Sequence, residues 1–313
     1  MRHINVLVIA PNFHGYGENI TLELKKAGQN AKCLTFQQGS QYSISSLLIM
    51  IFGLFYRHLF FFFLKLGSIK VDKVLIIRGD FLSQYEMNIL KSSSTDMYLW
   101  LMDPISRLKN LDVRPYKKVF SFDKYDSEVS GFSYLPLFSS FSKINNARLR
   151  DNKKILFIGS IYGDRLEKIR NLSLELKDYT IDVWGGFSIF KFMDYIRLKK
   201  TLIDYGNIKL RFGVINIKKL PVLANSYTYV FNSIPQDQLG LNMRFYEAVS
   251  VDIKQITHRD DHLILVYDSL RNDTGNNRQI TKRVSGSFVE LTTKKSDRKT
   301  ASACVNLILG LVS

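Results

Sequence analysis

The residues best suited to chemistry lie in one stretch, GLNMRFYEAV, which covers residues 240–249. An apolar run over residues 227–234 precedes it and predicts a buried strand, and from about residue 241 the apolar positions recur with helical spacing. A strand, a glycine-bearing turn and the amino end of a helix form an anion site, because free backbone N–H groups and the helix dipole point to one place. Arg244 adds a guanidinium suited to a diphosphate, and Glu247 adds a carboxylate suited to sugar hydroxyls.

The same spacing has a plainer explanation. Arg244 and Glu247 are three positions apart in the sequence, so they also fit an ion pair on the surface of an ordinary amphipathic helix. Spacing alone does not separate these two interpretations, and both stand at this stage.

Other polar residues directly follow predicted strands, and open α/β sheets bind ligands beyond the carboxyl ends of their strands. His14 follows the apolar run at residues 4–10, and Asp103 follows the run at residues 97–102. Either side chain could act as a base, as could Asp123 after the next strand. The alternatives are a loop histidine without chemistry and aspartates that cap helices.

The order of elements indicates the fold class. Strands and helices alternate in a way that is typical of doubly wound parallel sheets. A polar linker over residues 139–153 interrupts this alternation, which restarts at Lys154. We therefore predict an α/β protein with two Rossmann-like domains facing each other across a cleft, at residues 1–142 and 150–313. Residues 262–267 could form a last strand.

Composition limits the partners. The chain has 313 residues, enough for two domains, and its net charge of +16 suits nucleic acid, an anionic membrane or phosphate-bearing substrates. The basic residues are scattered and no base-stacking motif is present, so we expect no nucleic-acid partner. The two cysteines fit a reducing cytoplasm, and the five histidines include no HxxxH pair, so we expect no metal site.

Residues 44–66, ISSLLIMIFGLFYRHLFFFFLKL, form the most apolar segment. Its length suits a transmembrane helix, but Arg57 and His58 fall in its middle, where a charge is costly. We predict an aromatic helical hairpin or bent helix in the membrane interface, with Arg57, His58 and Lys65 at the headgroups. The alternatives are a buried core helix and a spanning helix. This segment makes an anionic membrane surface an expected partner, with peripheral association at the inner face of the membrane.

Four segments carry a resemblance to a known family. GLNMRFYEAVSVDIKQITHRD, from residue 240, resembles the donor-site segment of bacterial GT-B glycosyltransferases of the capsule, O-antigen and spore-maturation type. Three further segments resemble the same group in the same order: VLVIAPNFHGYGENI (6–20), YLWLMDPISR (98–107) with VFSFDKYD (119–126), and ILFIGSIYGDR (155–165). The resemblance spans residues 4–260 and implies an acceptor domain followed by a donor domain.

The resemblance also implies an activity, which is the transfer of a sugar from a nucleotide diphosphate sugar to a lipid-linked surface-polysaccharide acceptor. It implies no cofactor beyond this donor substrate. The residues that the resemblance places at the donor are Gly159, Arg165, Phe212, Gly240, Asn242, Arg244 and Glu247. An inverting enzyme would take its base from the first domain, where Asp103 and His14 are the candidates.

Some features of the group are absent or left open. Many related donor sites carry a second glutamate eight residues before the position of Glu247, and Leu239 stands there in this chain. The sequence therefore does not decide between retention and inversion. Many chains of the group end in a helix that crosses back to the first domain, and only residues 301–312 could form it here. A nucleotide-sugar 2-epimerase of the same fold and a non-catalytic, membrane-associated glycan-assembly scaffold remain as alternatives.

Overall fold

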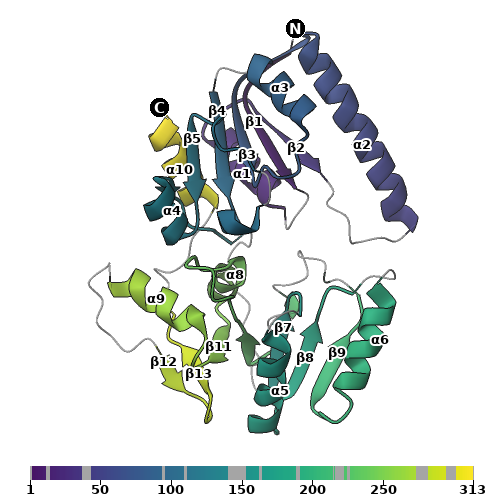
Figure 1. Cartoon of the computed structure of the whole chain (residues 1–313), viewed down its shortest axis with the longest axis vertical. Helices are drawn as coiled ribbons and strands as arrows, with labels where there is room; N and C mark the ends of the chain where they lie inside the picture. Colours follow the sequence, from purple (N-terminus) through teal and green to yellow (C-terminus); the bar gives the residue numbers. More distant parts are fainter. Residues whose placement is uncertain are drawn as a thin grey trace.

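The computed structural model describes most of the chain, namely residues 2–11, 15–36, 44–93, 96–108, 111–139, 153–161, 164–187, 191–213, 215, 222–223, 226–272, 281–293 and 301–312. It forms two α/β halves stacked along the long axis of the molecule (Figure 1). The elements of the first half, with the last helix, are β1 (Arg2–Pro11), α1 (Tyr16–Lys26), β2 (Ala31–Phe36), α2 (Ile44–Lys65), β3 (Ile69–Ile77), α3 (Gln84–Ser93), β4 (Asp96–Leu101), η1 (Ile105–Arg107), β5 (Lys118–Ser121), α4 (Lys124–Ser130), β6 (Ser133–Tyr134) and α10 (Ala301–Val312). Those of the second half are β7 (Lys154–Ile158), α5 (Arg165–Glu175), β8 (Thr180–Trp184), α6 (Phe192–Thr201), β9 (Ile208–Arg211), β10 (Tyr229–Phe231), α8 (Met243–Ser250), β11 (Lys254–His258), α9 (His262–Asn272), β12 (Thr281–Arg283) and β13 (Phe288–Leu291).

The first sheet has the strand order β2-β1-β3-β4-β5-β6, and every neighbouring pair is parallel. Helices cover both of its faces, which explains why its strands are continuous apolar runs. In β1, Val8 and Ala10 pack with α1 and α10, whereas Leu7 and Ile9 pack with α2 and α3. The chain adds β2 on one side of β1 and then β3 to β6 on the other side. The switch point of this sheet therefore lies between β1 and β3, next to the loop after β1.

The second sheet has the order β12-β13-β11-β10-β7-β8-β9. The five strands from β11 to β9 are parallel, and β13 and β12 add an antiparallel edge. The switch point lies between β7 and β10, where the loops that lead to α5 and α8 leave the sheet. Most of the predicted donor residues follow these two strands.

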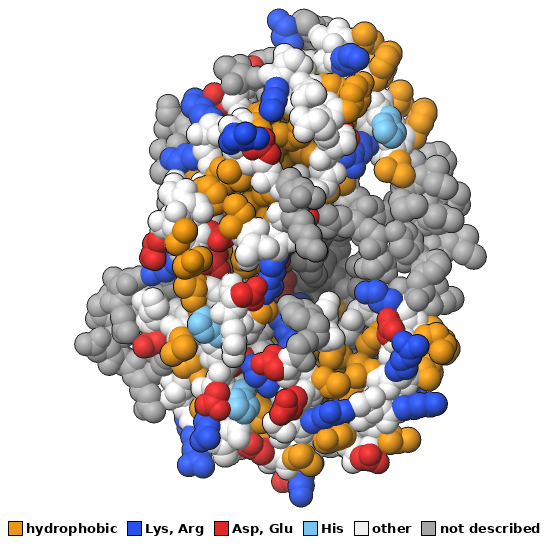
Figure 2. Space-filling model, in the orientation of Figure 1, with side chains coloured by type: hydrophobic (Ala, Val, Ile, Leu, Met, Phe, Trp, Pro, Cys, Tyr) orange, Lys and Arg blue, Asp and Glu red, His pale blue; other side chains and the backbone are white. Residues whose placement is uncertain are grey.

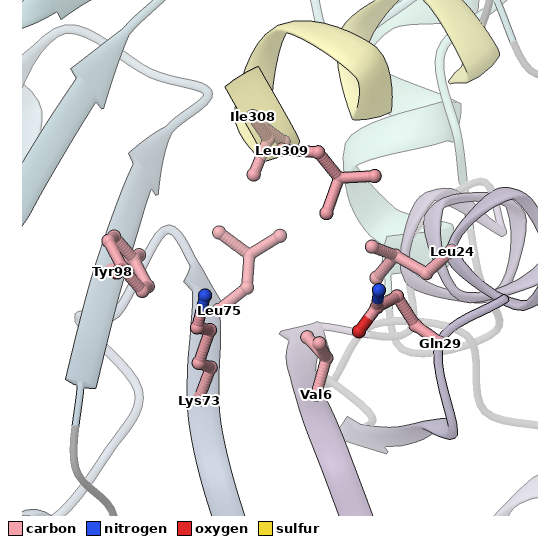
Figure 3. Close-up of a pocket in the computed structure, with 8 residues that line it drawn as sticks. All are labelled: Val6, Leu24, Gln29, Lys73, Leu75, Tyr98, Ile308 and Leu309. Carbon is pink, nitrogen blue, oxygen red and sulfur yellow. The ribbon is translucent and has the colours of Figure 1, made fainter. Parts of the chain in front are cut away.

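The last helix, α10, packs on the first sheet beside α1 (Figure 1), which is the return that the resemblance left open for residues 301–312. Cys304, Val305 and Ile308 are buried in the same apolar cluster as the α1 face of the sheet. Where Ile308 meets the strands, the packing leaves an apolar cavity of about 270 Å³ (Figure 3). This cavity lies beneath α10 on one face of the sheet, so it belongs to the docking of the helix.

The segment predicted as an interfacial helical hairpin or bent helix is one continuous helix, α2, which packs on β2, β3 and α3. One prediction within it is wrong: Arg57 does not lie at a headgroup level but points into the protein. Its guanidinium pairs with Glu86 through both carboxylate oxygens, donates to the Phe81 carbonyl at 3.3 Å and lies over the Phe36 ring. The helix is not fully buried either, because Phe55 is 62% exposed. Among the described residues, no helix has the length and apolar character needed to cross a membrane.

A second correction concerns residues 262–267, which are the start of helix α9 and not a strand. The Asp261 carboxylate accepts from the backbone N–H of Leu263 at 3.0 Å and so caps this helix. Leu263, Val266 and Tyr267 are buried, which is the spacing of one helical face. Residues 140–152, which make up most of the predicted linker, lie outside the described residues.

Candidate functional site

The loop from β10 to α8 is held in place by a buried network of amides. Asn242 is the N-cap of α8, and its side chain accepts from the Phe245 backbone N–H at 2.9 Å. Asn242 and Asn232 exchange hydrogen bonds of 2.8 and 3.2 Å, and Asn232 also donates to Gln255 at 3.1 Å. Gln255 is fully buried and lies on β11. The amino end of α8 is therefore fixed to two strands of the second sheet.

The same loop contacts the first half of the molecule. Gly240 packs so closely on Phe122 that a Cβ at this position would lie 2.5 Å from the ring and 2.6 Å from the backbone oxygen. The backbone N–H of Leu239 donates to Asp123 at 2.7 Å. Asp123 also caps α4 by accepting from the Tyr125 N–H at 2.9 Å, and it is 1% exposed. Its role as a helix cap, one of the alternatives from the sequence, is thus the role that the structure shows.

Arg244 and Glu247 form an ion pair within α8. The pair is not on the surface, since Glu247 is 2% exposed and the Nε of Arg244 is buried without a hydrogen-bond partner. The Tyr16 hydroxyl, from the start of α1, donates to the other carboxylate oxygen of Glu247 at 3.5 Å. Burial raises the pKa of Glu247, although Arg244 and Tyr16 both act in the opposite direction. Glu247 therefore orients Arg244, and each of its carboxylate oxygens has a partner within the protein.

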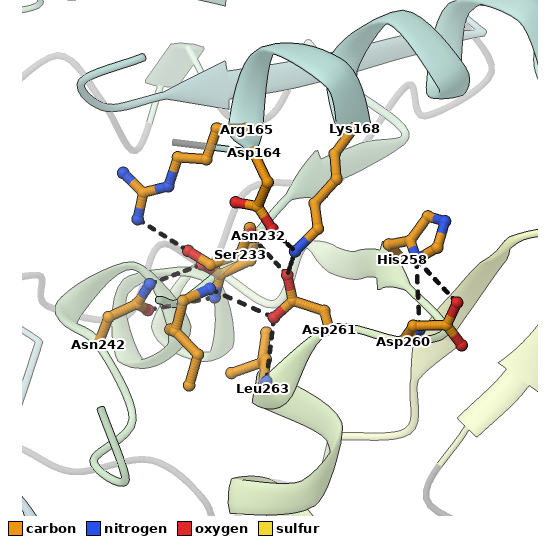
Figure 4. Close-up of polar contacts among 11 residues, drawn as sticks. Asp164, Arg165, Lys168, Asn232, Ser233, Asn242, His258, Asp260, Asp261 and Leu263 are labelled. Atoms are coloured by element: carbon orange, nitrogen blue, oxygen red, sulfur yellow. Dashed lines mark hydrogen bonds and ion pairs between the residues drawn. The ribbon is translucent and has the colours of Figure 1, made fainter. Parts of the chain in front are cut away.

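The loop after β7 provides a second cation. Gly159 has a φ of 152° and Arg165 is the first residue of α5. The guanidinium of Arg165 donates to the backbone carbonyls of Ser160 at 3.1 Å and Ser233 at 3.0 Å. It therefore bridges the two loops at the switch point, beside the amides that hold Asn242 (Figure 4). This contact joins the loop after β7, with Gly159 and Arg165, to the loop after β10, which leads to Asn242 and Arg244.

Sequence reasoning missed the centre of this arrangement, which is Asp261 (Figure 4). Its carboxylate is fully buried and pairs with Lys168 at 2.7 Å. It also accepts from the Ser233 hydroxyl and from the Ile234 N–H. Lys168 lies one turn after Arg165 on α5, so Asp261 ties this helix to the loops after β10 and β11. The signal was the pair of aspartates that ends the β11 segment, a position where carboxylates line the edge of a parallel sheet.

Phe212 lies apart from this centre, at the end of β9. Its ring is 45% exposed and packs edge-on against Tyr195 at 5.1 Å and Phe192 at 6.0 Å between centroids. The structure thus places it in an aromatic cluster on α6. Whether a nucleobase stacks there remains a prediction.

The two predicted bases belong to the first half. Asp103 follows β4, its side chain is 40% exposed, and Arg78 lies 3.4 Å from it. Arg78 has a φ of 76°, in the left-handed region, directly after β3. His14 lies outside the described residues. Within the described part of the chain, no group of three or more histidine, cysteine, aspartate or glutamate side chains could hold a metal ion.

Comparison with known proteins adds information at the level of fold. No family model matches the sequence, and no curated protein matches it. A glycosyltransferase from Rickettsia africae matches with a TM-score of 0.56 at 12% identity, over 99% of this chain and 98% of that chain. An Anabaena protein solved in complex with UDP and glucose matches with a TM-score of 0.54 at 11% identity, over 99% of both chains. This chain has the GT-B fold.

The predicted fold class is therefore confirmed. The GT-B fold does not by itself select a reaction, because the UDP-GlcNAc 2-epimerase from Neisseria meningitidis also matches, with a TM-score of 0.52 at 9% identity over 99% of both chains. The choice between transfer and epimerisation depends on the site.

Proposed function

We propose that this chain is a glycosyltransferase that moves a sugar from a nucleotide diphosphate sugar to a lipid-linked surface-polysaccharide acceptor. The observation that carries the proposal is Arg165, whose guanidinium is fixed across the switch point of the second sheet. Beside it lies the amino end of α8, which Asn242 caps. A fixed cation next to a helix amino end suits a diphosphate.

The proposed chemistry assigns a role to each group. The bond between the sugar C1 and the diphosphate oxygen breaks, and a bond from C1 to an acceptor hydroxyl oxygen forms. The proton of that hydroxyl passes to a base, for which Asp103 and His14 are the candidates. The leaving diphosphate gains negative charge, which Arg165 and Arg244 stabilise without a metal. Two of the fold neighbours were solved with UDP, glucose or UDP-GlcNAc, which supports a nucleotide sugar as the donor.

A binding experiment tests the site directly. We expect UDP, GDP or dTDP to stabilise the wild type in a thermal-shift panel, and titration calorimetry then gives the dissociation constant. Because a charge-assisted hydrogen bond contributes roughly 1.5–3 kcal/mol, Arg165→Ala and Arg244→Ala should each weaken binding by about tenfold or more. Arg114, whose side chain is 88% exposed in the first half, provides the matched control Arg114→Ala. Equal affinities in all four folded proteins would refute the donor site.

A product assay separates transfer from its alternatives. Incubation with a panel of nucleotide sugars and a lipid-linked acceptor should yield a glycosylated acceptor. A C2 epimer that forms without any acceptor would establish the 2-epimerase instead, an activity that the Neisseria neighbour makes reasonable. The absence of any nucleotide binding by the wild type would favour the glycan-assembly scaffold.

We also propose that the protein associates peripherally with the inner face of the membrane. The outward side of α2 carries large apolar side chains that are 37–62% exposed, namely Phe55, Leu59, Phe62, Phe63 and, just after the helix, Leu66. Lys65 lies over the exposed ring of Tyr85 beside this surface. A helix with an exposed aromatic side and flanking cations suits the headgroup region of an anionic bilayer. Co-sedimentation with anionic vesicles, reversed in part by salt, is the expected result.

A further inference from the structure

A second helix has the same surface character as α2 but belongs to the other half of the molecule. Helix α6 buries none of its own residues, and its outward side chains are apolar and basic. Met193 is 63% exposed, Phe192 is 48% exposed, and Ile203, just after the helix, is 76% exposed. The exposed basic residues beside them are Lys191, Arg197, Lys199 and Lys200.

The spacing on α6 mixes the two kinds of side chain on one side. Met193, Arg197 and Lys200 are exposed and lie three or four residues apart, so they form one row along the helix. Tyr195 and Leu198 are less exposed, and Tyr195 packs on Phe187 and Phe212. The helix is therefore anchored on its inner side through aromatic contacts. Its outer side presents apolar groups among cations.

The topology places α2 and α6 on one flank. Helix α2 packs on β2, the edge strand of the first sheet, and α6 packs by Phe212 at the end of β9, the edge strand of the second sheet. Both edges lie on the same side of the molecule, at the right in Figure 1. In Figure 2, basic and hydrophobic side chains lie together along the lower part of this flank, and hydrophobic side chains line its upper part.

We propose that α6 is a second membrane-contacting element and that an anionic bilayer covers this flank of both halves. Charge complementarity identifies the partner, because residues 191–203 contain four basic residues and one acidic residue, Asp194, within a chain of net charge +16. Exposed apolar side chains among these cations distinguish a bilayer from a purely polar anionic partner. This inference rests on the proposed association of α2 with the membrane. The consequence is that both halves approach the same lipid surface.

Vesicle co-sedimentation of the full chain tests this inference with charge-matched variants. The probe is a vesicle of equal parts phosphatidylcholine and phosphatidylglycerol, with pure phosphatidylcholine as reference. Because each basic residue near an anionic surface contributes about 1 kcal/mol, Lys199→Gln with Lys200→Gln should weaken binding about thirtyfold. The control is Lys282→Gln with Arg283→Gln on β12, which removes the same charge at the opposite edge of the same sheet. It should change binding much less.

A second pair of variants tests the apolar contribution. Met193→Ser with Ile203→Ser should lower vesicle binding, whereas Leu265→Ser, at a position 65% exposed on α9, should not. Equal binding of the α6 variants and their controls would overturn the role of α6, and equal affinity of the wild type for both vesicle types would do the same.

The role of α2 is tested separately, so that the two failures can be told apart. If Phe55→Ser with Phe62→Ser abolishes binding while the α6 variants bind like the wild type, the α2 proposal stands and the α6 inference falls. If the wild type does not sediment with anionic vesicles, both fall. Nucleotide affinity should be unchanged in the lysine variants, which confirms that the donor site is intact.

Discussion

Arg57→Met is expected to destabilise the first half of the molecule by about 3–5 kcal/mol, because removing one partner of a buried ion pair leaves the other charge uncompensated. The burial of both side chains supports a value within this range. Glu86 is 5% exposed, and the Arg57 side chain is 16% exposed. After the substitution, Glu86 would keep only the N–H and hydroxyl of Ser83, at 2.9 and 2.8 Å.

Urea unfolding of a double-mutant cycle measures this interaction. Glu86→Leu alone should also be strongly destabilising, because it leaves the guanidinium buried without its partner. The combination of Arg57→Met and Glu86→Leu should lie nearer to the wild type than either single variant, since apolar replacement of a whole buried pair is often neutral. The coupling energy from the cycle reports the pair itself.

The pH dependence gives an independent check. Burial alone would raise the pKa of Glu86, but hydrogen bonds from Arg57 and Ser83 outweigh it and hold the pKa below its usual value. A depressed folded-state pKa stabilises the fold above the unfolded value of about 4.3, and this contribution is lost as the pH falls through the folded value. The destabilisation by Arg57→Met should therefore shrink at acidic pH.

One result would refute this reasoning. If the unfolding free energy of Arg57→Met lies within about 0.5 kcal/mol of the wild-type value, as is usual for surface substitutions, the pair does not form in solution. If the same variant also loses vesicle binding, Arg57 faces lipid, as the sequence alone had predicted.

Three further outcomes follow from the site. Gly240→Ala should destabilise the protein by about 1–3 kcal/mol in urea unfolding, because its Cβ would overlap Phe122. The control Gly53→Ala, in open space on a helix, should be stabilising by up to about 1 kcal/mol. Equal changes in unfolding free energy for the two variants would argue against the contact of Gly240 with Phe122. Tyr16→Phe removes a hydroxyl that donates to the buried carboxylate of Glu247 and should lower the unfolding free energy by roughly 0.5–1.5 kcal/mol in urea unfolding, the value of one hydrogen bond. Asp261→Asn should lower the unfolding free energy by about 1.5–3 kcal/mol, because the largely buried Lys168 ammonium then keeps only Asp164, at 2.8 Å, as a charged partner. An unchanged midpoint would show that this network does not form.

The positions of the buried parallel strands were predictable from the sequence, because a strand that is buried on both faces is a continuous apolar run. This holds for the strands β1, β4 and β7. The start of α9 was misjudged, since a short apolar run fits a strand or a helix equally well. The deciding feature was the preceding Asp261, whose carboxylate caps the helix.

Contacts between residues that are far apart in the chain could not be predicted from the sequence. Nothing near Arg57 in the chain indicates that Glu86, 29 positions away, neutralises it. Tyr16 and Glu247 are separated by 231 positions. Glu247 was predicted as a hydrogen-bond acceptor for sugar hydroxyls because it lies three residues after Arg244, on the same face of the helix. Its burial depends on the first half of the molecule, which packs over that helix.

The loop before α8 belongs to both halves, and this has a consequence for donor binding. Asp237 pairs with Arg107, and the Leu239 N–H donates to Asp123. Gly240 packs on Phe122, so three parts of the loop contact the first half of the molecule. On the other side, the amides of the second sheet fix the N-cap of the same helix. A movement of one half relative to the other must therefore break one of these sets of contacts or carry the amino end of α8 with it. The position of Arg244 is thus coupled to the first half of the molecule, so we expect substitutions of Phe122 and Asp123, directly after β5, to change donor affinity without touching the donor.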